Sequence, residues 1–222
     1  RLIKNCARQF NMNASFMAKP FSDEAGNGMH VHLSVVDKDG NNVFTVDKNK
    51  QPQGLFSHAI GGLLKTTPDF LSFYAPHSNS YRRLVHNADH APTTLSWGNE
   101  NRTALIRLPE ASAEATRLEF RVASADSNPY LVFASVLASV YAGIQGKLQH
   151  DKETIGNAHA QHPPSLGVTW REAVEKTSVS SLVKDFFGEQ FQQCYQCVKE
   201  SEIKRFESTI TDFEYHSYLR SL

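Results

Sequence analysis

Residues 26–34 read Gly-Asn-Gly-Met-His-Val-His-Leu-Ser, and this stretch predicts a glycine turn that leads into a β-strand. Side chains of a strand alternate between its two faces, so the apolar residues share one face and the polar residues share the other. The polar face would carry His30, His32 and Ser34. Because imidazole is a common metal ligand and can also donate a hydrogen bond to phosphate, this face is a candidate binding surface.

A second alternating stretch, Arg-Leu-Glu-Phe-Arg-Val at residues 117–122, predicts another strand. Its apolar side chains would join the core, and its other face would carry Arg117, Glu119 and Arg121. Carboxylates bind hard cations, and arginines bind phosphate and carboxylate groups. Alone, this pattern is more typical of a solvated surface strand. Beside a strand that carries two histidines, it favours a binding site.

The composition restricts the class of protein. The chain has 222 residues, enough for one or two domains, with 23 Lys and Arg residues against 23 Asp and Glu. This balance predicts no nucleic-acid partner and no membrane partner, and no segment is typical of a signal peptide or a transmembrane helix. Cys6, Cys194 and Cys197 are odd in number, which favours a reducing, cytoplasmic compartment. The spacing of Cys194 and Cys197 has no second pair, so a structural zinc site is not expected.

Helical segments are expected on both sides of these strands. Apolar spacing predicts a helix over residues 54–66, which ends at Pro68 or is followed there by a shorter one. Asp126 or Ser127 is expected to cap a helix that has Pro129 in its first turn. Because that helix is apolar on nearly every side, we expect it to be buried.

Further strands are expected at residues 93–97 and 103–108, on both sides of a turn, and a polar linker is expected at residues 150–168. Antiparallel strands with segregated helices predict an α+β fold. The chain begins at Arg1 in the middle of a helical pattern, so we interpret it as a fragment of a longer protein.

Five further motifs accompany residues 26–34. They are Phe-Met-Ala-Lys-Pro at 16–20, Asn-Ser-Tyr-Arg-Arg-Leu at 79–84, Asn-Arg-Thr-Ala-Leu-Ile-Arg-Leu-Pro at 101–109, Arg-Leu-Glu-Phe-Arg at 117–121 and Asp-Ser-Asn-Pro-Tyr-Leu at 126–131. In this order, the motifs resemble those of the glutamine synthetase family. Within this family, the chain is most similar to the γ-glutamyl-amine (polyamine-type) ligases, because of the pair Arg82-Arg83 and the dipeptide Trp97-Gly98.

The resemblance implies the antiparallel sheet of the family's catalytic domain, with packed helices around it. Residues 1–146 would be the C-terminal portion of that domain, and residues 147–222 would be its C-terminal helical region. The family's enzymes use ATP to phosphorylate the γ-carboxylate of glutamate, and ammonia or an amine then displaces the phosphate. The full-length protein would be a ring-shaped homo-oligomer that uses ATP with Mg²⁺ or Mn²⁺.

The resemblance also implies a role for each site residue. His30 and Glu119 would share the metal ion across adjacent strands. The residues that would bind ATP are His32, Ser34, Arg107 and Arg117. The residues that would bind glutamate are Gly26, Arg83 and Arg121, with Arg121 on the α-carboxylate. Arg102 would stabilise the transferring phosphoryl group.

The chain departs from the family pattern at three positions. The flap glutamate that holds ammonium and takes its proton is replaced by His90, with Asp89 beside it, so these two residues become the catalytic candidates for the amine step. A lysine expected before Arg117 is missing, and Ala25 stands where an asparagine helps to bind glutamate. Because histidine cannot attract a cation as a carboxylate does, we expect an alkylamine or polyamine to outcompete ammonia. The alternative is a structural or regulatory paralogue without catalytic activity.

Overall fold

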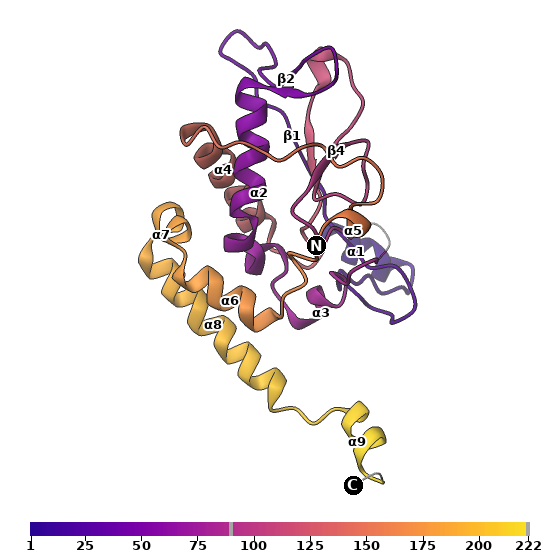
Figure 1. The fold of residues 1–222 in the computed structure, drawn as a ribbon. Helices are drawn as coiled ribbons and strands as arrows, with labels where there is room; N and C mark the ends of the chain where they lie inside the picture. The colour runs from indigo at the N-terminus through magenta and orange to yellow at the C-terminus, as the bar shows by residue number, and fades with distance from the viewer. Residues whose placement is uncertain (89–90, 221–222) are drawn as a thin grey trace.

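The computed structural model describes residues 1–88 and 91–220, and it has the α+β fold that the sequence predicts (Figure 1). The helices are α1 (Leu2–Gln9), α2 (Gly54–Tyr74), α3 (Ser78–Tyr81), α4 (Pro129–Gln145), α5 (Ala158–Gln161), α6 (Trp170–Val179), α7 (Ser181–Phe187), α8 (Glu189–Glu207) and α9 (Asp212–Tyr218). The strands are β1 (Val31–Leu33), β2 (Thr45–Val46), β3 (Pro52–Gln53), β4 (Trp97–Asn99), β5 (Ile106–Leu108) and β6 (Leu118–Phe120), and a 3₁₀ turn covers Ala113–Ala115.

The central sheet has four strands in the order β1-β6-β5-β4. Strand β6 pairs antiparallel with β1 on one side and with β5 on the other, as expected. Strand β4 departs from the all-antiparallel expectation because it pairs with β5 in parallel.

The alternation of the two motif strands is confirmed. Val31 lies opposite Phe120, and both side chains are buried in the core. His32 lies opposite Glu119, which in turn lies opposite Arg107 on β5. The sheet therefore has one apolar face and one face that carries histidine, glutamate and arginine.

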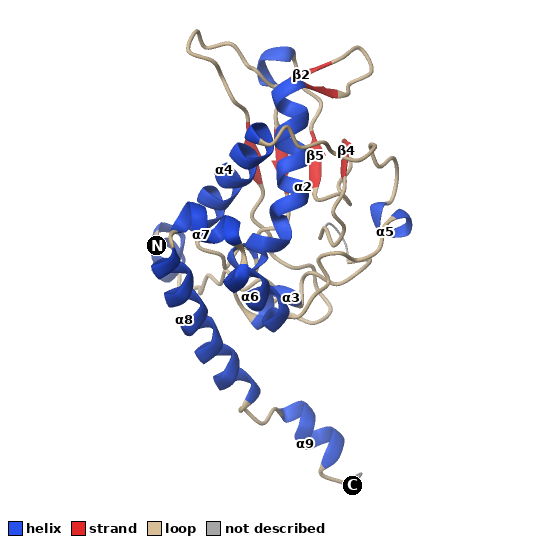
Figure 2. Cartoon of the chain, turned by 60° about the vertical axis from the view of Figure 1, so that its left-hand side comes forward, coloured by secondary structure: helices blue, strands red, loops and turns tan. Residues whose placement is uncertain are grey.

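Helices α2 and α4 pack against each other and cover the apolar face of the sheet (Figures 1 and 2). The ring of Tyr74, at the end of α2, meets that of Phe120 at 5.0 Å between centroids. Phe56 and Ile60 of the same helix are completely buried. Burial of such side chains contributes roughly 1.5–3 kcal/mol each, so this layer fixes the position of the sheet.

Helix α2 passes through Pro68, so the expectation that the helix would end or restart there was wrong. Proline lacks an N–H group and leaves one carbonyl of the preceding turn without its helical partner. Thr67 donates its hydroxyl to the Leu63 carbonyl at 2.6 Å, which adds a side-chain hydrogen bond beside the break. The helix continues because Phe70 and Phe73 beyond the proline are buried in the core.

Helix α4 differs from expectation at its start and on its surface. Its cap is Asn128, whose side chain accepts a hydrogen bond from the Tyr130 N–H at 3.0 Å, and neither Asp126 nor Ser127 takes that role. The helix is buried on one face only, since Leu137 is 58% exposed and Tyr141 is 56% exposed. The apolar composition of this helix therefore led to an overestimate of the fraction of its surface that is buried.

The segment expected as a polar linker is fixed against the edge of the sheet. The Thr154 N–H donates to the Trp97 carbonyl at 2.9 Å, and the Trp97 indole donates to the Asp151 carbonyl at 2.8 Å. Further along, the Leu166 N–H donates to the Thr93 carbonyl at 2.9 Å. These hydrogen bonds attach the segment at Asp151, Thr154 and Leu166 to β4 and to Thr93 before it.

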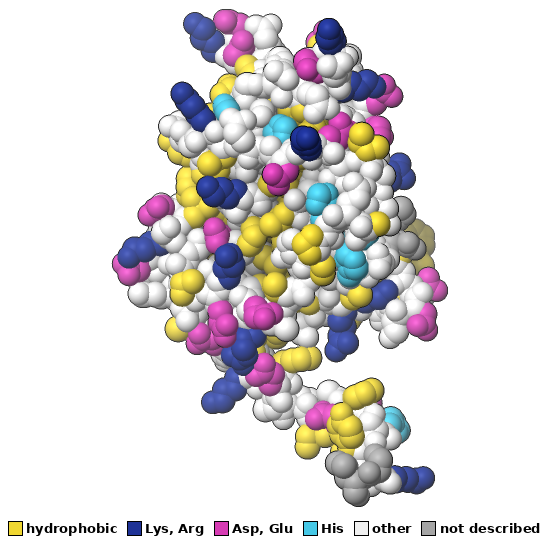
Figure 3. Space-filling model, in the orientation of Figure 1, with side chains coloured by type: hydrophobic (Ala, Val, Ile, Leu, Met, Phe, Trp, Pro, Cys, Tyr) yellow, Lys and Arg dark blue, Asp and Glu magenta, His cyan; other side chains and the backbone are white. Residues whose placement is uncertain are grey.

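The C-terminal helices are delimited by residues that are typical of helix boundaries. Thr169 and Glu172 form a capping box at the start of α6, and Gly188 separates α7 from α8 with φ of 87°. Helix α9 stands apart from the body of the molecule (Figures 1 and 2). On the face seen in Figure 3, acidic and basic side chains are interspersed, as the equal charge totals suggest. None of the described helices is long and apolar enough to cross a membrane.

Candidate functional site

Glu119 lies at the centre of the polar face of the sheet. Its Oε1 atom is 2.7 Å from His30 Nδ1 and 2.8 Å from an Arg121 terminal nitrogen, and its Oε2 atom is 2.7 Å from an Arg107 terminal nitrogen. The residue is 3% exposed. Burial alone would raise the pKa of this carboxyl, but the hydrogen bond from Arg107 and the charge of Arg121 lower it below its usual range. Glu119 is therefore an ionised, buried carboxylate.

His30 precedes β1, and its ring joins Glu119 to a neighbouring cavity. Burial, followed by the charge of Arg121, lowers the pKa of His30, so the neutral imidazole is favoured. With Nδ1 facing the carboxylate, the neutral ring carries its hydrogen there and leaves the Nε2 lone pair free for a ligand. The strand alternation correctly predicts that His30 and Glu119 meet.

Arg107 bridges two acidic residues. One terminal nitrogen contacts Glu119, and the other contacts Glu100 Oε2 at 2.6 Å. The hydrogen bond to Glu100 is the largest influence that raises the pKa of Arg107. Glu100 also accepts a hydrogen bond from the Glu110 N–H. Sequence reasoning missed Glu100 because it treated residues 98–101 only as a turn; the acidic side chain in that turn was the available signal.

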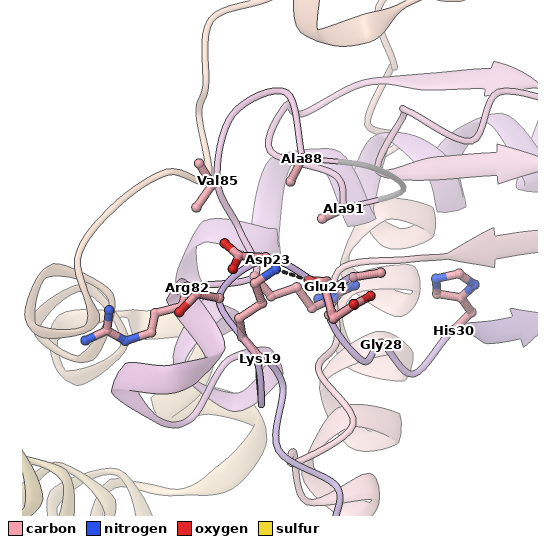
Figure 4. A pocket seen from close by; sticks show the side chains of 13 residues that line it. Lys19, Asp23, Glu24, Gly28, His30, Arg82, Val85, Ala88 and Ala91 are labelled. Atoms are coloured by element: carbon pink, nitrogen blue, oxygen red, sulfur yellow. Dashed lines mark hydrogen bonds between the residues drawn. The ribbon is translucent and has the colours of Figure 1, made fainter.

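A cavity of about 530 Å³ opens beside His30 (Figure 4). The glycine-rich loop before β1 forms one wall, with Asp23 and Glu24 at its rim. Apolar residues of the segment after α3 form another wall; these are Val85, Ala88 and Ala91. No role in the site is predicted for these two acids from the sequence, although their loop immediately precedes the histidine strand.

Arg83 explains the glycines of this loop. A Cβ atom at Gly28 would lie 2.7 Å from an Arg83 terminal nitrogen, and one at Gly26 would lie 2.9 Å from the Arg83 Cγ. Arg83 is 5% exposed and donates to the backbone carbonyls of Val122 and Arg121 at 2.9 and 3.1 Å. Burial, followed by the charge of Arg121, lowers the pKa of Arg83 to about 10. Arg82 also lines the cavity, and its side chain extends away from His30 (Figure 4).

The remaining candidates lie around this centre. Arg117 Nε is 3.3 Å from His32 Nδ1, so these two candidates meet on the polar face. Arg121 is 3% exposed and donates to the Arg102 carbonyl at 2.9 Å, whereas the Arg102 side chain is exposed. Ser34 is exposed beyond the end of β1.

Two of the catalytic candidates, Asp89 and His90, lie outside the described residues. Within residues 1–88 and 91–220, no group of three or more His, Cys, Asp and Glu side chains converges as a metal site would require. His30 and Glu119 are therefore a pair of donors and not a complete coordination shell.

Comparison with known proteins agrees with these motifs. Residues 1–218 match the family model described as the glutamine synthetase catalytic domain. The chain is 34% identical over 221 residues to γ-glutamylputrescine synthetase PuuA of Escherichia coli, covering 100% of this chain and 46% of that protein. It is 34% identical over 224 residues to glutamate–isopropylamine ligase of a Pseudomonas species, covering 98% of this chain and 48% of that protein.

A solved structure described as apo GmaS without ligand has the same fold, with a TM-score of 0.85 and 26% identity. The match covers 99% of this chain and 51% of that one. The chain thus spans about half the length of the curated relatives and the solved structure that it matches. Since the family model extends over residues 1–218, the chain belongs to the glutamine synthetase family.

Proposed function

We propose that the full-length protein is an ATP-dependent ligase that joins the γ-carboxylate of glutamate to an amine through γ-glutamyl phosphate. One observation carries this proposal. Buried Glu119 is held by His30 and two arginines on a polar sheet face, directly beside a cavity of about 530 Å³. Such a centre suits a reaction that brings two anions together, because positive groups must offset their repulsion.

In the first step, a γ-carboxylate oxygen of glutamate attacks the terminal phosphorus of ATP, and ADP leaves. We assign Arg107 and Arg117 to the phosphates, with His32 and Ser34 beside the nucleotide. Arg102, whose side chain is exposed, is assigned to the transferring phosphoryl group. The contact between Arg117 and His32 at 3.3 Å supports their assignment to one ligand.

His30 and Glu119 fit part of a site for Mg²⁺ or Mn²⁺. His30 would bind the ion through Nε2, because its Nδ1 already faces Glu119 Oε1 at 2.7 Å. The Glu119 carboxylate would supply the second donor. When bound, the ion supplies positive charge against the phosphoryl oxygens. Its other ligands would come from substrate, water or chain beyond these residues.

We assign the binding of glutamate to Gly26, Arg83 and Arg121. The two arginines are almost fully buried and place positive charge behind the cavity wall. Gly26 allows the loop backbone to approach closely, because a side chain there would collide with the Ala18 carbonyl at 2.7 Å. The glutamate carboxylates would thus meet backbone and guanidinium groups together.

In the second step, the amine nitrogen attacks the acyl carbon, phosphate leaves, and the nitrogen loses a proton. We propose that Asp89 binds the charged amine and that His90 accepts the proton. The apolar wall of Val85, Ala88 and Ala91 supports an organic amine over ammonia, because it can cover an alkyl chain. PuuA and the isopropylamine ligase carry organic amines in their names.

We also propose that the full-length protein is a cytoplasmic homo-oligomeric ring. The free, exposed cysteines Cys6, Cys194 and Cys197 support a reducing compartment. The ring is proposed from family membership alone.

The test is phosphate release by the full-length protein with ATP, glutamate and a panel of amines. We expect turnover that requires both glutamate and an amine, with the γ-glutamyl amide identified by mass spectrometry. ATP turnover that is independent of glutamate, or no amide product with any amine, would refute the proposal.

The alternative is a structural or regulatory paralogue without catalytic activity. One observation favours it: both ends of Arg107 are held by Glu100 and Glu119, which reduces the charge available to a phosphate. A folded full-length protein that binds ATP but forms no amide would support this alternative.

A further inference from the structure

A hydrogen-bonded bridge of three residues lies behind the apolar wall of the cavity. Thr93 Oγ1 is 3.3 Å from His86 Nδ1 and 3.1 Å from His159 Nδ1. The two imidazole rings stand perpendicular to each other, with their centroids 5.2 Å apart. Thr93 is fully buried, and His159 is 7% exposed. The bridge joins both ends of the segment 86–93 to helix α5.

The hydrogens of this bridge can be assigned from its geometry. A threonine hydroxyl has one hydrogen to donate and two lone pairs to accept with. His159 Nε2 is buried and has no hydrogen-bond partner among the described residues. Since a buried N–H without an acceptor is rarer than an unpaired acceptor, His159 carries its hydrogen on Nδ1 and donates it to Thr93. Thr93 then donates its own hydrogen to His86 Nδ1.

The bridge is anchored on its far side. The Leu166 N–H holds the Thr93 carbonyl at 2.9 Å, and Asn157 caps α5 through the His159 N–H at 3.0 Å. On the near side, the segment between His86 and Thr93 carries Ala88 and Ala91, which line the cavity. A fixed bridge at the base of this segment therefore sets where the apolar wall stands.

We propose that His86, Thr93 and His159 form a clamp that positions the apolar cavity wall for the substrates of the ligase reaction. His159 is a positioning residue: it acts on the wall through Thr93. The effect on kinetics rests on the proposed function, whereas the effect on amide exchange of residues 86–88 and 91–93 does not. The signal in the sequence is His86, which stands near the start of the segment that departs from the family's flap pattern.

The test compares paired variants of the full-length protein. Thr93→Val and His159→Leu remove the hydrogen-bonding groups, whereas Thr93→Ser and His159→Asn keep a polar atom at the same place. His162→Leu is the matched control, because His162 bonds Thr154 at 2.8 Å in the same segment and does not take part in the bridge. Amide hydrogen exchange of residues 84–94 and steady-state kinetics are measured for each variant.

We expect Thr93→Val and His159→Leu to raise exchange of residues 84–94 and the KM for amine and glutamate about fivefold, the effect of one neutral hydrogen bond. The kcat and the KM for ATP should change less than about twofold, and the Ser, Asn and His162→Leu variants should resemble the wild type. Unchanged exchange in Thr93→Val and His159→Leu would overturn the clamp. Raised exchange with unchanged KM in an active enzyme would overturn its role in positioning the wall. If the wild type forms no amide, the proposed function fails, and exchange alone decides the clamp.

Discussion

Replacement of Glu119 by glutamine tests the charge balance of the site most directly. The carboxylate accepts hydrogen bonds from His30, Arg107 and Arg121 at 2.7–2.8 Å and is 3% exposed. An amide of the same size removes the negative charge and turns one acceptor into a donor that faces a cationic partner. Glu119→Gln thus leaves two guanidinium groups without their shared buried counter-charge.

The expected loss of stability follows from this burial. Breaking a buried ion pair by removing one partner costs about 3–5 kcal/mol. A loss of this size should appear as a fall in both the melting temperature and the urea midpoint. Ligase activity or metal affinity should also fall by about 10–100-fold, as for other changes around metal sites.

Glu100→Gln is the matched control, because Glu100 contacts the same Arg107 from the exposed side. Its side chain is 51% exposed, and exposed ion pairs contribute about 0–1 kcal/mol. Both variants should be unfolded thermally and by urea as full-length proteins, with activity assayed in parallel. A Glu119→Gln protein as stable as Glu100→Gln would refute the reasoning that Glu119 is the buried counter-charge of this site.

Four further outcomes are expected. In the full-length enzyme, kcat/KM should be higher for putrescine, ethylamine or ethanolamine than for ammonia, since each CH₂ buried against the wall at Val85 contributes about 0.8 kcal/mol; a highest value for ammonia would contradict this. Gly28→Ala should displace Arg83, because the new Cβ would lie 2.7 Å from its guanidinium, and should lower the unfolding free energy by about 1–3 kcal/mol. Gly167→Ala should have little effect, because its Cβ would lie 3.5 Å from the nearest atom. Burial, followed by the charge of His86, lowers the pKa of His159. Below about pH 6.5 the unfolded chain therefore takes up a proton that the folded chain does not. The free energy of unfolding should fall as the pH drops from 7 to 5, and the slope should be shallower in His159→Asn. Residues 1–222 alone should show no amine-dependent ATP turnover, because the described residues provide only a pair of metal donors at the site.

The sheet and its polar face could be predicted because they depend on local alternation. A period of two places His30 and His32 on one face, and the same rule places Glu119 between its arginines. The observed register places His32 opposite Glu119, and His30, two residues earlier on the same face, reaches the Glu119 carboxylate at 2.7 Å. These features follow from short stretches of sequence.

The features that sequence reasoning missed depend on contacts between distant segments. Glu100 reaches Arg107 only because β4 lies parallel to β5, which no local pattern indicates. Pro68 stays inside α2 because the core beyond it outweighs the lost hydrogen bond. The supposed linker at residues 150–168 is fixed by backbone hydrogen bonds that its polar composition does not reveal.

The charges of the polar face give the proposed phosphate-binding arginines different tasks. Arg107 is paired with two carboxylates. A phosphate could pair with the Arg107 guanidinium only by displacing Glu100, the exposed partner. Arg117 has no carboxylate partner among the described residues; its hydrogen-bond acceptors are His32 Nδ1 and the Ala115 carbonyl. A phosphate can therefore pair with Arg117 without breaking an ion pair, which makes this guanidinium the first contact that an incoming nucleotide would form on this face. Exchange of Glu100 for phosphate at Arg107 would then follow, and it would cost little because the Glu100 carboxylate stays in water.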